Sequence, residues 1–277
     1  MFFTIIRYDA TSNATREEGI IVYILIGLIA LAALIYSLFI LPTQWLKIER
    51  IQYKTGAGIK VLQISDIHIE HIRIPASRLK RLIRSERPAF VCITGDFTEL
   101  APYLNKVDRY IKELASAGVP MFAVYGNHDH HLAPADLQKL TRMLEKAGVR
   151  LLHNEVYHAG QYELIGIDDW TSKKSDPDKA FEKADPAKPA IVLTHDPNVV
   201  LHIKHPFTYL MAGHFHGMQF HLPFLFKYLR KGALPAAGIY KGMHQMENGM
   251  IYISKGISQT GTNARFLIRS EVTIHEL

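Results

Sequence analysis

The sequence has only one cysteine, Cys92, among its 277 residues, so no disulfide can form within the chain. Cys92 lies in the apolar run 89–94 and is interpreted as a small buried hydrophobe. The sequence also lacks a long basic run, and its net charge of +6 is too mild to argue for a nucleic-acid partner. Hydrophobic residues make up 48% and charged residues 21%, close to globular averages, which excludes wholesale disorder.

Charged residues are absent from one long stretch, Ile20 to Leu41. At about 1.5 Å per residue, a helix of this length spans the roughly 30 Å hydrocarbon core of a bilayer. Pro42 and Trp45 then supply a stop and an interfacial aromatic. A cleaved signal peptide is the main alternative, but no Ala-x-Ala site follows Leu41. We therefore predict an uncleaved transmembrane anchor over residues 20–41.

The domain after the anchor is predicted to lie on the cytoplasmic side. Residues 1–19 hold two basic residues and residues 42–60 hold four, and basic residues near a membrane span favour the cytoplasm. The predicted organisation is an N-terminal polar segment (1–19), the anchor (20–41), a linker with a first strand (42–58) and a folded domain (59–277).

From Ile48 onward, apolar strands alternate with amphipathic helices, which is typical of an α/β domain whose sheet has parallel portions and helices on its faces. Residues 171–189 are predicted to form a surface loop with a short helix, and 271–277 an edge hairpin. The predicted helices cover residues 76–86, 103–117 and 134–147. The predicted strands cover residues 59–65, 89–94, 119–125, 162–167, 190–194, 208–212, 249–254 and 264–269.

Five of the predicted strands are followed directly by Asp, Asn or His. In an open α/β sheet, ligands bind at the loops beyond the strand ends. Each short motif alone could be a turn or a chance match, but five in succession at strand ends indicate one site. Carboxylate and amide oxygens with imidazoles suit Mn, Fe or Zn, and the lack of a thiolate argues against structural zinc. The motifs are Asp66-Ile-His68, Gly95-Asp96, Gly126-Asn-His-Asp129, His195-Asp196 and Gly213-His-Phe-His216.

These motifs resemble the calcineurin-like metallophosphoesterase superfamily, whose pattern is D-x-H, G-D, G-N-H-D/E, H and G-H-x-H. The resemblance covers Ile59 to the C-terminus, and every element of the pattern is present. It implies an α/β fold, a metallophosphoesterase-type β-sandwich of mixed sheets with βαβ units and flanking helices. It also implies a hydrolase with two divalent metal ions, with manganese as the first expectation and iron or zinc as the alternatives.

The resemblance further implies a role for each motif residue. His128 would lie near the phosphate and stabilise its charge or protonate the leaving oxygen, and Asp129 would orient the His128 ring. A bridging carboxylate agrees with the need for a shared anion between two cations about 3.5–4 Å apart. The implied ligands are Asp66, His68 and His216 for the first ion, Asn127, His195 and His214 for the second, and Asp96 bridging both.

Further segments look like a membrane-associated bacterial branch of the superfamily, which includes YkuE-like and YaeI-like phosphodiesterases and lipid A pathway pyrophosphatases. Met218 stands where this branch usually has glycine. The anchor fits the same branch and implies a bacterial inner membrane protein with one membrane span. The segments are Leu152-His-Asn-Glu155, Ile165-Gly-Ile-Asp-Asp169, His195-Asp-Pro197 and Gly213-His-Phe-His-Gly-Met-Gln219.

This branch implies cleavage of a phosphodiester or pyrophosphate bond, with a lipid-linked nucleotide such as UDP-2,3-diacylglucosamine as the most attractive substrate, giving lipid X and UMP. The expected partners are therefore a phosphorylated, lipid-linked small molecule and the bilayer, and no nucleic acid. A broader phosphodiesterase or phosphatase of the envelope is one alternative, and an inactive membrane scaffold of the same fold is another. The intact motifs disfavour the scaffold.

Residues 220–235 are aromatic, aliphatic and basic, and they directly follow the last histidine motif. Two interpretations stay open: an insertion that packs into the core, or a flap that faces lipid. In the second, apolar side chains would meet acyl chains while Lys227, Arg230 and Lys231 would meet anionic head groups.

Overall fold

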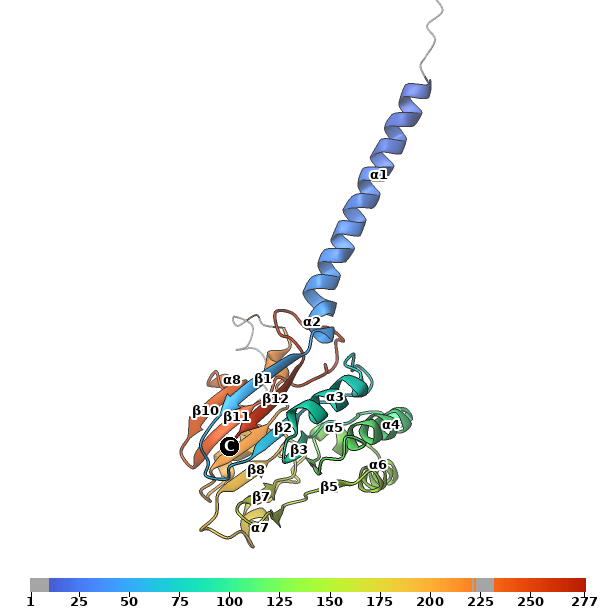
Figure 1. The fold of residues 1–277 in the computed structure, drawn as a ribbon. Coiled ribbons are helices and arrows are strands. Elements are labelled where there is room, and N and C mark those ends of the chain that lie inside the picture. The colour runs from blue at the N-terminus through green and yellow to red at the C-terminus, as the bar shows by residue number, and fades with distance from the viewer. Residues whose placement is uncertain (1–9, 221, 223–231) are drawn as a thin grey trace, which may run out of the picture.

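The computed structural model describes residues 10–220, 222 and 232–277, which contain two six-stranded sheets (Figure 1). The first sheet has the order β1-β12-β2-β3-β4-β5, and its pairs are parallel except β12–β2. Its strands are β1 (Lys47–Gln52), β2 (Lys60–Ile64), β3 (Phe90–Thr94), β4 (Met121–Val124), β5 (Val149–Leu151) and β12 (Glu271–Glu276).

The second sheet has the order β10-β11-β9-β8-β7-β6. The three central pairs are parallel, and the outer pairs β10–β11 and β6–β7 are antiparallel. Its strands are β6 (Glu155–His158), β7 (Glu163–Gly166), β8 (Ala190–Leu193), β9 (Tyr209–Ala212), β10 (Gly242–Met246) and β11 (Gly249–Ile253). The short strands β5, β6 and β10 were not predicted from the sequence.

The two sheets share one apolar interior. Phe90 and Phe122 of the first sheet and Tyr209 and Tyr252 of the second belong to the same buried cluster. The central strands β2, β3 and β4 are buried on their other face as well, beneath helices. Strands buried on both faces have nearly continuous apolar sequences, which explains why these three were predictable.

Three helices cover the outer face of the first sheet: α3 (Ala76–Glu86), α4 (Leu104–Ala115) and α6 (Pro134–Lys146). Each buries one apolar stripe, as Leu79 and Ile83 of α3 show by lying one turn apart. The outer face of the second sheet packs against α7 (Pro177–Phe181), the 3₁₀ helix η3 (Pro197–His202) and α8 (Ala233–Ala236). The predicted fold class, a mixed α/β sandwich flanked by helices, is confirmed.

Two sequence predictions at the C-terminus are wrong. Residues 264–269 form no strand beyond one isolated bridge at Phe266, because Leu267 has a positive φ of 57°, which interrupts an extended chain. The segment 271–277 is not an edge hairpin, because β12 lies between β1 and β2. The side chains of Glu271, Thr273 and His275 are buried, and Thr273 donates to the Tyr252 hydroxyl of the second sheet.

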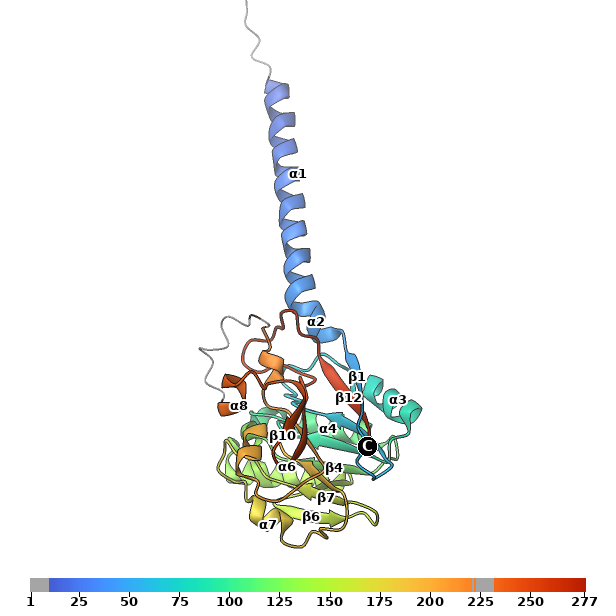
Figure 2. The same ribbon diagram turned by 90° about the vertical axis from the view of Figure 1, so that its left-hand side faces the viewer.

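A long apolar helix projects from the domain (Figures 1 and 2). Helix α1 (Ala10–Ile35) continues through a π-helical turn, η1 (Tyr36–Ile40), into α2 (Leu41–Gln44). The span Glu18–Gln44 is long and apolar enough to cross a membrane by length and composition, and its apolar part is not buried in the protein. The segment proposed as a lipid-facing flap falls mainly on residues 221 and 223–231, which lie outside the described residues.

His275 of β12 predicts a pH-dependent stability. Burial lowers the pKa of this imidazole to about 3, and its ring contacts the Tyr209 hydroxyl (3.0 Å) and the Gln63 amide oxygen (3.1 Å). The folded protein keeps the ring neutral, whereas the unfolded chain binds a proton below about pH 6.5, so this contribution to stability is lost as the pH falls below 6.5. At pH 5 the loss is about 2 kcal/mol.

Denaturant unfolding of the wild type and of His275→Gln at pH 7.5 and pH 5.0 measures this effect. The variant is expected to be less stable at pH 7.5 but to lose about 2 kcal/mol less on acidification than the wild type. An equal loss in both proteins would contradict the assignment, because all other titrating groups are shared.

Candidate metal centre

The five polar motifs meet at one end of the sandwich, as their positions after β2, β3, β4, β8 and β9 predict. The ligand atoms of Asp66, His68, Asp96 and His216 all lie within 4.8 Å of one another, and all four side chains are buried. His195 joins this group through Asp96, and His214 joins through His195. The structure therefore brings six of the seven predicted ligands together in one connected cluster of short contacts.

Asp96 occupies the middle of the cluster. Its Oδ2 atom lies 3.3 Å from Nε2 of His68 and 3.1 Å from Nε2 of His195. On one side, His216 Nε2 is 3.3 Å from Asp66 Oδ1, and on the other, His214 Nδ1 is 3.2 Å from His195 Nε2. Atoms that share a metal at about 2.0–2.2 Å are separated by about 3 Å, so these spacings fit coordination spheres on both sides of one carboxylate.

Main-chain carbonyls fix two of the imidazole rings. His195 Nδ1 lies 2.8 Å from the Thr94 carbonyl, and His216 Nδ1 lies 3.0 Å from the Ser258 carbonyl. A ring that donates through Nδ1 presents a bare Nε2, which is the usual orientation of a metal-binding histidine. In both rings this Nε2 atom points to a carboxylate of the cluster.

The backbone at these positions is strained. Five candidate ligands have positive φ angles, a conformation that non-glycine residues rarely adopt. Such strain persists only where the surrounding structure enforces it, and it concentrates at functional sites. The residues are Asp66 (φ 56°), His68 (φ 34°), Asp96 (φ 58°), His214 (φ 71°) and His216 (φ 52°).

Two glycines make room for the carboxylates. A Cβ atom on Gly126 would lie 2.1 Å from Asp96 Oδ1, and one on Gly213 would lie 2.5 Å from Asp66 Oδ2 and 1.8 Å from Ser65 Oγ. Both glycines are thus required by close approach of a side chain rather than by turn geometry. Met218, where the related branch has glycine, is buried and adopts a glycine-like φ of 66°.

The residues present fit a pair of divalent ions. His68 Nε2 and Asn127 Oδ1 are buried atoms with no hydrogen-bond partner among the described residues, although buried polar atoms are normally paired. A metal ion would satisfy both. The donor set of carboxylate, amide oxygen and imidazole suits Mn, Fe or Zn, and it divides into two groups around Asp96.

The charges of the cluster depend on one another. Burial by itself would raise the pKa of Asp96, but the neighbouring His195 and His68 hold it well below the usual value. Burial opposes protonation of His195, yet the Asp96 carboxylate raises the pKa of His195 well above its ordinary value. A deprotonated carboxylate between basic groups is the charge arrangement that a shared metal ligand needs.

Asp129 does not orient the His128 ring, contrary to the prediction. Its carboxylate accepts hydrogen bonds from the main-chain N–H groups of Gly126, Asp96, Phe97 and Thr98, at 2.8–3.2 Å. Burial and the nearby Asp96 charge raise the pKa of Asp129 to about 7, against the pull of these donors. Asp129 therefore ties the loop after β3 to the loop after β4 and fixes the backbone of Asp96.

The residue beside His128 is Glu99, which the sequence analysis missed. Glu99 Oε2 lies 3.1 Å from His128 Nδ1, and the opposite ring atom, Nε2, lies 3.5 Å from the Thr260 hydroxyl. Burial lowers the pKa of His128, while Asp96 and Glu99 act in the opposite direction. The available sequence signal was an acidic residue three positions after Asp96, in a segment that otherwise resembles a surface turn.

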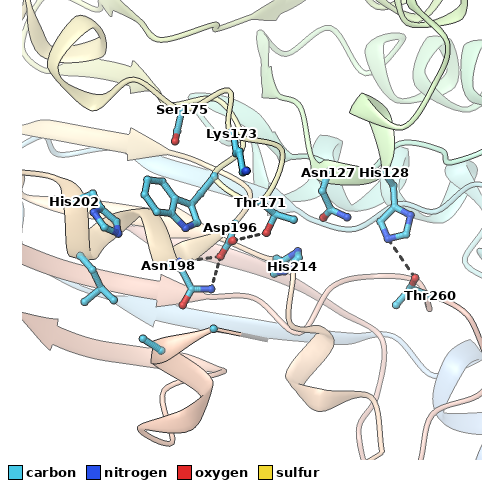
Figure 3. A pocket seen from close by; sticks show the side chains of 14 residues that line it. Asn127, His128, Thr171, Lys173, Ser175, Asp196, Asn198, His202, His214 and Thr260 are labelled. Atoms are coloured by element: carbon cyan, nitrogen blue, oxygen red, sulfur yellow. Dashed lines mark hydrogen bonds between the residues drawn. The ribbon is translucent and has the colours of Figure 1, made fainter. Parts of the chain in front are cut away.

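An open cavity of about 940 Å³ adjoins the cluster (Figure 3). Asn127, His128 and Thr260 lie at one end of it, and Lys173 and His202 lie towards the other (Figure 3). The His202 ring stacks on Trp170 at a centroid separation of 3.9 Å. The cavity gives a substrate several times larger than phosphate direct access to the candidate metal ligands.

The buried carboxylate–imidazole cluster at the strand ends of this sandwich has the donor set of a divalent-metal centre. Residues 59–218 match the calcineurin-like phosphoesterase family, and the chain belongs to that family. The cluster and the family together define a metal-dependent phosphoester hydrolase. The family fold implies a dimetal centre.

Three relatives illustrate the similarity. The chain is 33% identical over 267 residues to the uncharacterized metallophosphoesterase YkoQ of Bacillus subtilis, a match covering 90% of this chain and 98% of that protein. It is 26% identical over 217 residues to the UDP-2,3-diacylglucosamine pyrophosphatase LpxG of Chlamydia muridarum, covering 60% and 66%. It is 25% identical over 240 residues to a transmembrane protein with metallophosphoesterase domain of Bos taurus, covering 78% and 52%.

Proposed function

We propose that this chain is a membrane-anchored dimetal hydrolase that cleaves a phosphodiester or pyrophosphate bond in a lipid-linked substrate. The observation that carries this proposal is the 940 Å³ cavity beside the buried cluster, in a protein with a long exposed apolar helix. UDP-2,3-diacylglucosamine, split into lipid X and UMP, is the proposed substrate. The similarity to LpxG supports it, because that relative is named as the pyrophosphatase of this compound.

The proposed ligand assignment follows the two sides of Asp96. Two divalent ions, manganese in this proposal, would supply activation of water and neutralisation of phosphate charge. Asp96 lies between the two groups and would be shared by both ions. The first ion would be held by Asp66, His68 and His216, and the second by Asn127, His195 and His214.

His128 is the proposed proton donor to the leaving oxygen. Its Nε2 atom lies on the side of Thr260 and the cavity, while Nδ1 faces the Glu99 carboxylate. A carboxylate at Nδ1 fixes the orientation of an imidazole and stabilises its protonated form. Asp129 takes part indirectly, because it holds the main chain of Asp96 and of Gly126.

The apolar helix is proposed as a single-pass anchor over residues 20–41 in a bacterial inner membrane, with the linker and first strand (42–58) and the domain (59–277) on the cytoplasmic side. The span Glu18–Gln44 has the length and composition for this, and the bovine relative is named as a transmembrane protein. Protease added to inverted vesicles should then digest the domain, and protease added to spheroplasts should not. The reverse pattern would contradict the orientation.

A substrate panel with the purified full-length chain in detergent and Mn²⁺ tests the function. We expect kcat/KM for UDP-2,3-diacylglucosamine to exceed that for bis(p-nitrophenyl) phosphate at least about 100-fold, because binding energy from the lipid and nucleotide parts contributes to the transition state. UMP and lipid X should appear in equal amounts. Cleavage of the soluble diester without cleavage of the lipid nucleotide would reject the lipid substrate and favour a broad phosphodiesterase.

A further inference from the structure

Residues 255–270 belong to the segment between β11 and β12, and we call them the brace segment. They contact the loops that carry candidate metal ligands. Their backbone pairs with the loop that carries Asp66 and His68: Ile257 N–H donates to the Ser65 carbonyl at 2.9 Å and Ser258 N–H to the Asp66 carbonyl at 3.1 Å. The Ser258 carbonyl accepts from His216 Nδ1 at 3.0 Å. The brace segment thus contacts both loops of the first proposed metal site.

Arg265 is the centre of the brace segment and is fully buried. Its guanidinium donates to the main-chain carbonyls of Lys255 (2.8 Å), Gly256 (3.1 Å) and Arg269 (3.3 Å), and to that of Ser258. Burying a cation is costly unless its donors are satisfied, and here main-chain carbonyls accept from Nη1 and Nη2, while Nε has no hydrogen-bond partner among the described residues. The Ser258 carbonyl is therefore held between Arg265 on one side and His216 on the other.

The opposite side of the brace segment contacts the C-terminal end of the apolar helix. We call residues 36–46 the helix base. The Arg265 N–H donates to the Phe39 carbonyl at 3.0 Å, and the rings of Phe39 and Phe266 stack at 5.2 Å. Ser270 donates twice, from its N–H to the Pro42 carbonyl and from its hydroxyl to the Thr43 carbonyl, both at 3.0 Å.

We propose that Arg265 is a positioning residue that sets the metal-binding geometry of His216 through the Ser258 carbonyl, and that the helix base completes this support from the other side. The apolar helix then contributes to metal affinity, besides any role as an anchor. This inference rests on the proposed assignment of His216 as a metal ligand. Changing the partner that orients a metal-binding histidine typically costs 10- to 100-fold in affinity.

The test is titration of the metal-free, full-length chain with Mn²⁺ by isothermal calorimetry, with circular dichroism as a check of folding. Arg265→Met is expected to weaken binding at one of the two sites by 10- to 100-fold, and Arg265→Lys by less. Arg50→Met is the control. Arg50 is an exposed arginine of β1 that pairs with Glu86, and no contact joins it to the brace segment or to the helix base among the described residues. The affinity of this variant should stay within twofold of the wild type.

Phe39→Ala tests the contribution of the helix base without changing the brace segment. We expect the Mn²⁺ affinity to fall at least threefold at the site that Arg265→Met weakens, with hydrolytic activity recovered at saturating Mn²⁺. A folded Arg265→Met protein with wild-type affinity overturns the proposal. If Arg265→Met does not fold, Phe39→Ala decides, and an unchanged affinity in that variant overturns the proposal. A wild type that binds no Mn²⁺ would instead reject the proposed metal site.

Discussion

Asp96→Asn is expected to abolish hydrolysis, with kcat/KM reduced at least on the order of 10³-fold. The reason is the position of Asp96, whose Oδ2 atom lies 3.3 Å from His68 Nε2 and 3.1 Å from His195 Nε2. Changes outside the coordination sphere already cost 10- to 100-fold in metal affinity or activity, and a ligand shared by two cations would supply negative charge to both. Asparagine keeps the shape of the side chain and removes that charge.

Metal analysis after dialysis against a fixed low Mn²⁺ concentration provides the direct measurement. The wild type should retain two ions per chain and Asp96→Asn no more than one. Asp108→Asn is the control, because Asp108 forms an ion pair with Lys112 at 2.7 Å on the surface of α4, and such pairs contribute little. Two retained ions and normal turnover in Asp96→Asn would remove Asp96 from the metal centre.

His128→Ala should lower kcat by about 10²- to 10⁴-fold while leaving the metal content at two ions. The side chain lines the cavity and is not among the proposed ligands, and its Nδ1 atom faces Glu99 at 3.1 Å. A general acid matters most when the leaving group is a poor one. The loss should therefore be large for a phosphodiester that releases an alkoxide and small for one that releases p-nitrophenolate.

Glu99→Gln tests the carboxylate charge beside His128 separately from the imidazole itself. It should reduce kcat less than His128→Ala does, with KM and metal content close to the wild type, because the imidazole stays in place but loses the adjacent charge.

An equal loss for both leaving groups in His128→Ala would argue against a general acid and for charge stabilisation of the phosphate. An unchanged kcat in His128→Ala would exclude both roles.

The fold was largely predictable because its central strands are buried on both faces and its helices bury one stripe. Continuous apolar runs marked β2, β3 and β4, and the spacing of Leu79 and Ile83 marked α3. Strand β12 was misjudged because its alternation imitates an edge strand. Its polar side chains are instead satisfied inside the sandwich, as the contact of Thr273 with Tyr252 shows, and such a partner is distant in sequence.

The candidate site was found from the sequence because metal ligands must be particular residue types, and parallel strands bring their ends to one edge. The groups that orient the side chains of this site were not found from the sequence. The partners of His128 and His216 are Glu99 and the Ser258 carbonyl, and a main-chain carbonyl leaves no mark in a sequence. Asp129 was likewise assigned to the wrong partner, because only the structure shows the four N–H groups around it.

The sequence by itself determined the candidate donor atoms for metals, their order along the strands, and a helix long enough to cross a membrane. These depend on residue type and local pattern. The tertiary structure decided which groups orient those donors and how the apolar helix meets the site through Arg265 and Phe39. The contacts between the helix and the segment of Arg265 join residues more than 200 positions apart, and they form only when the whole sandwich closes.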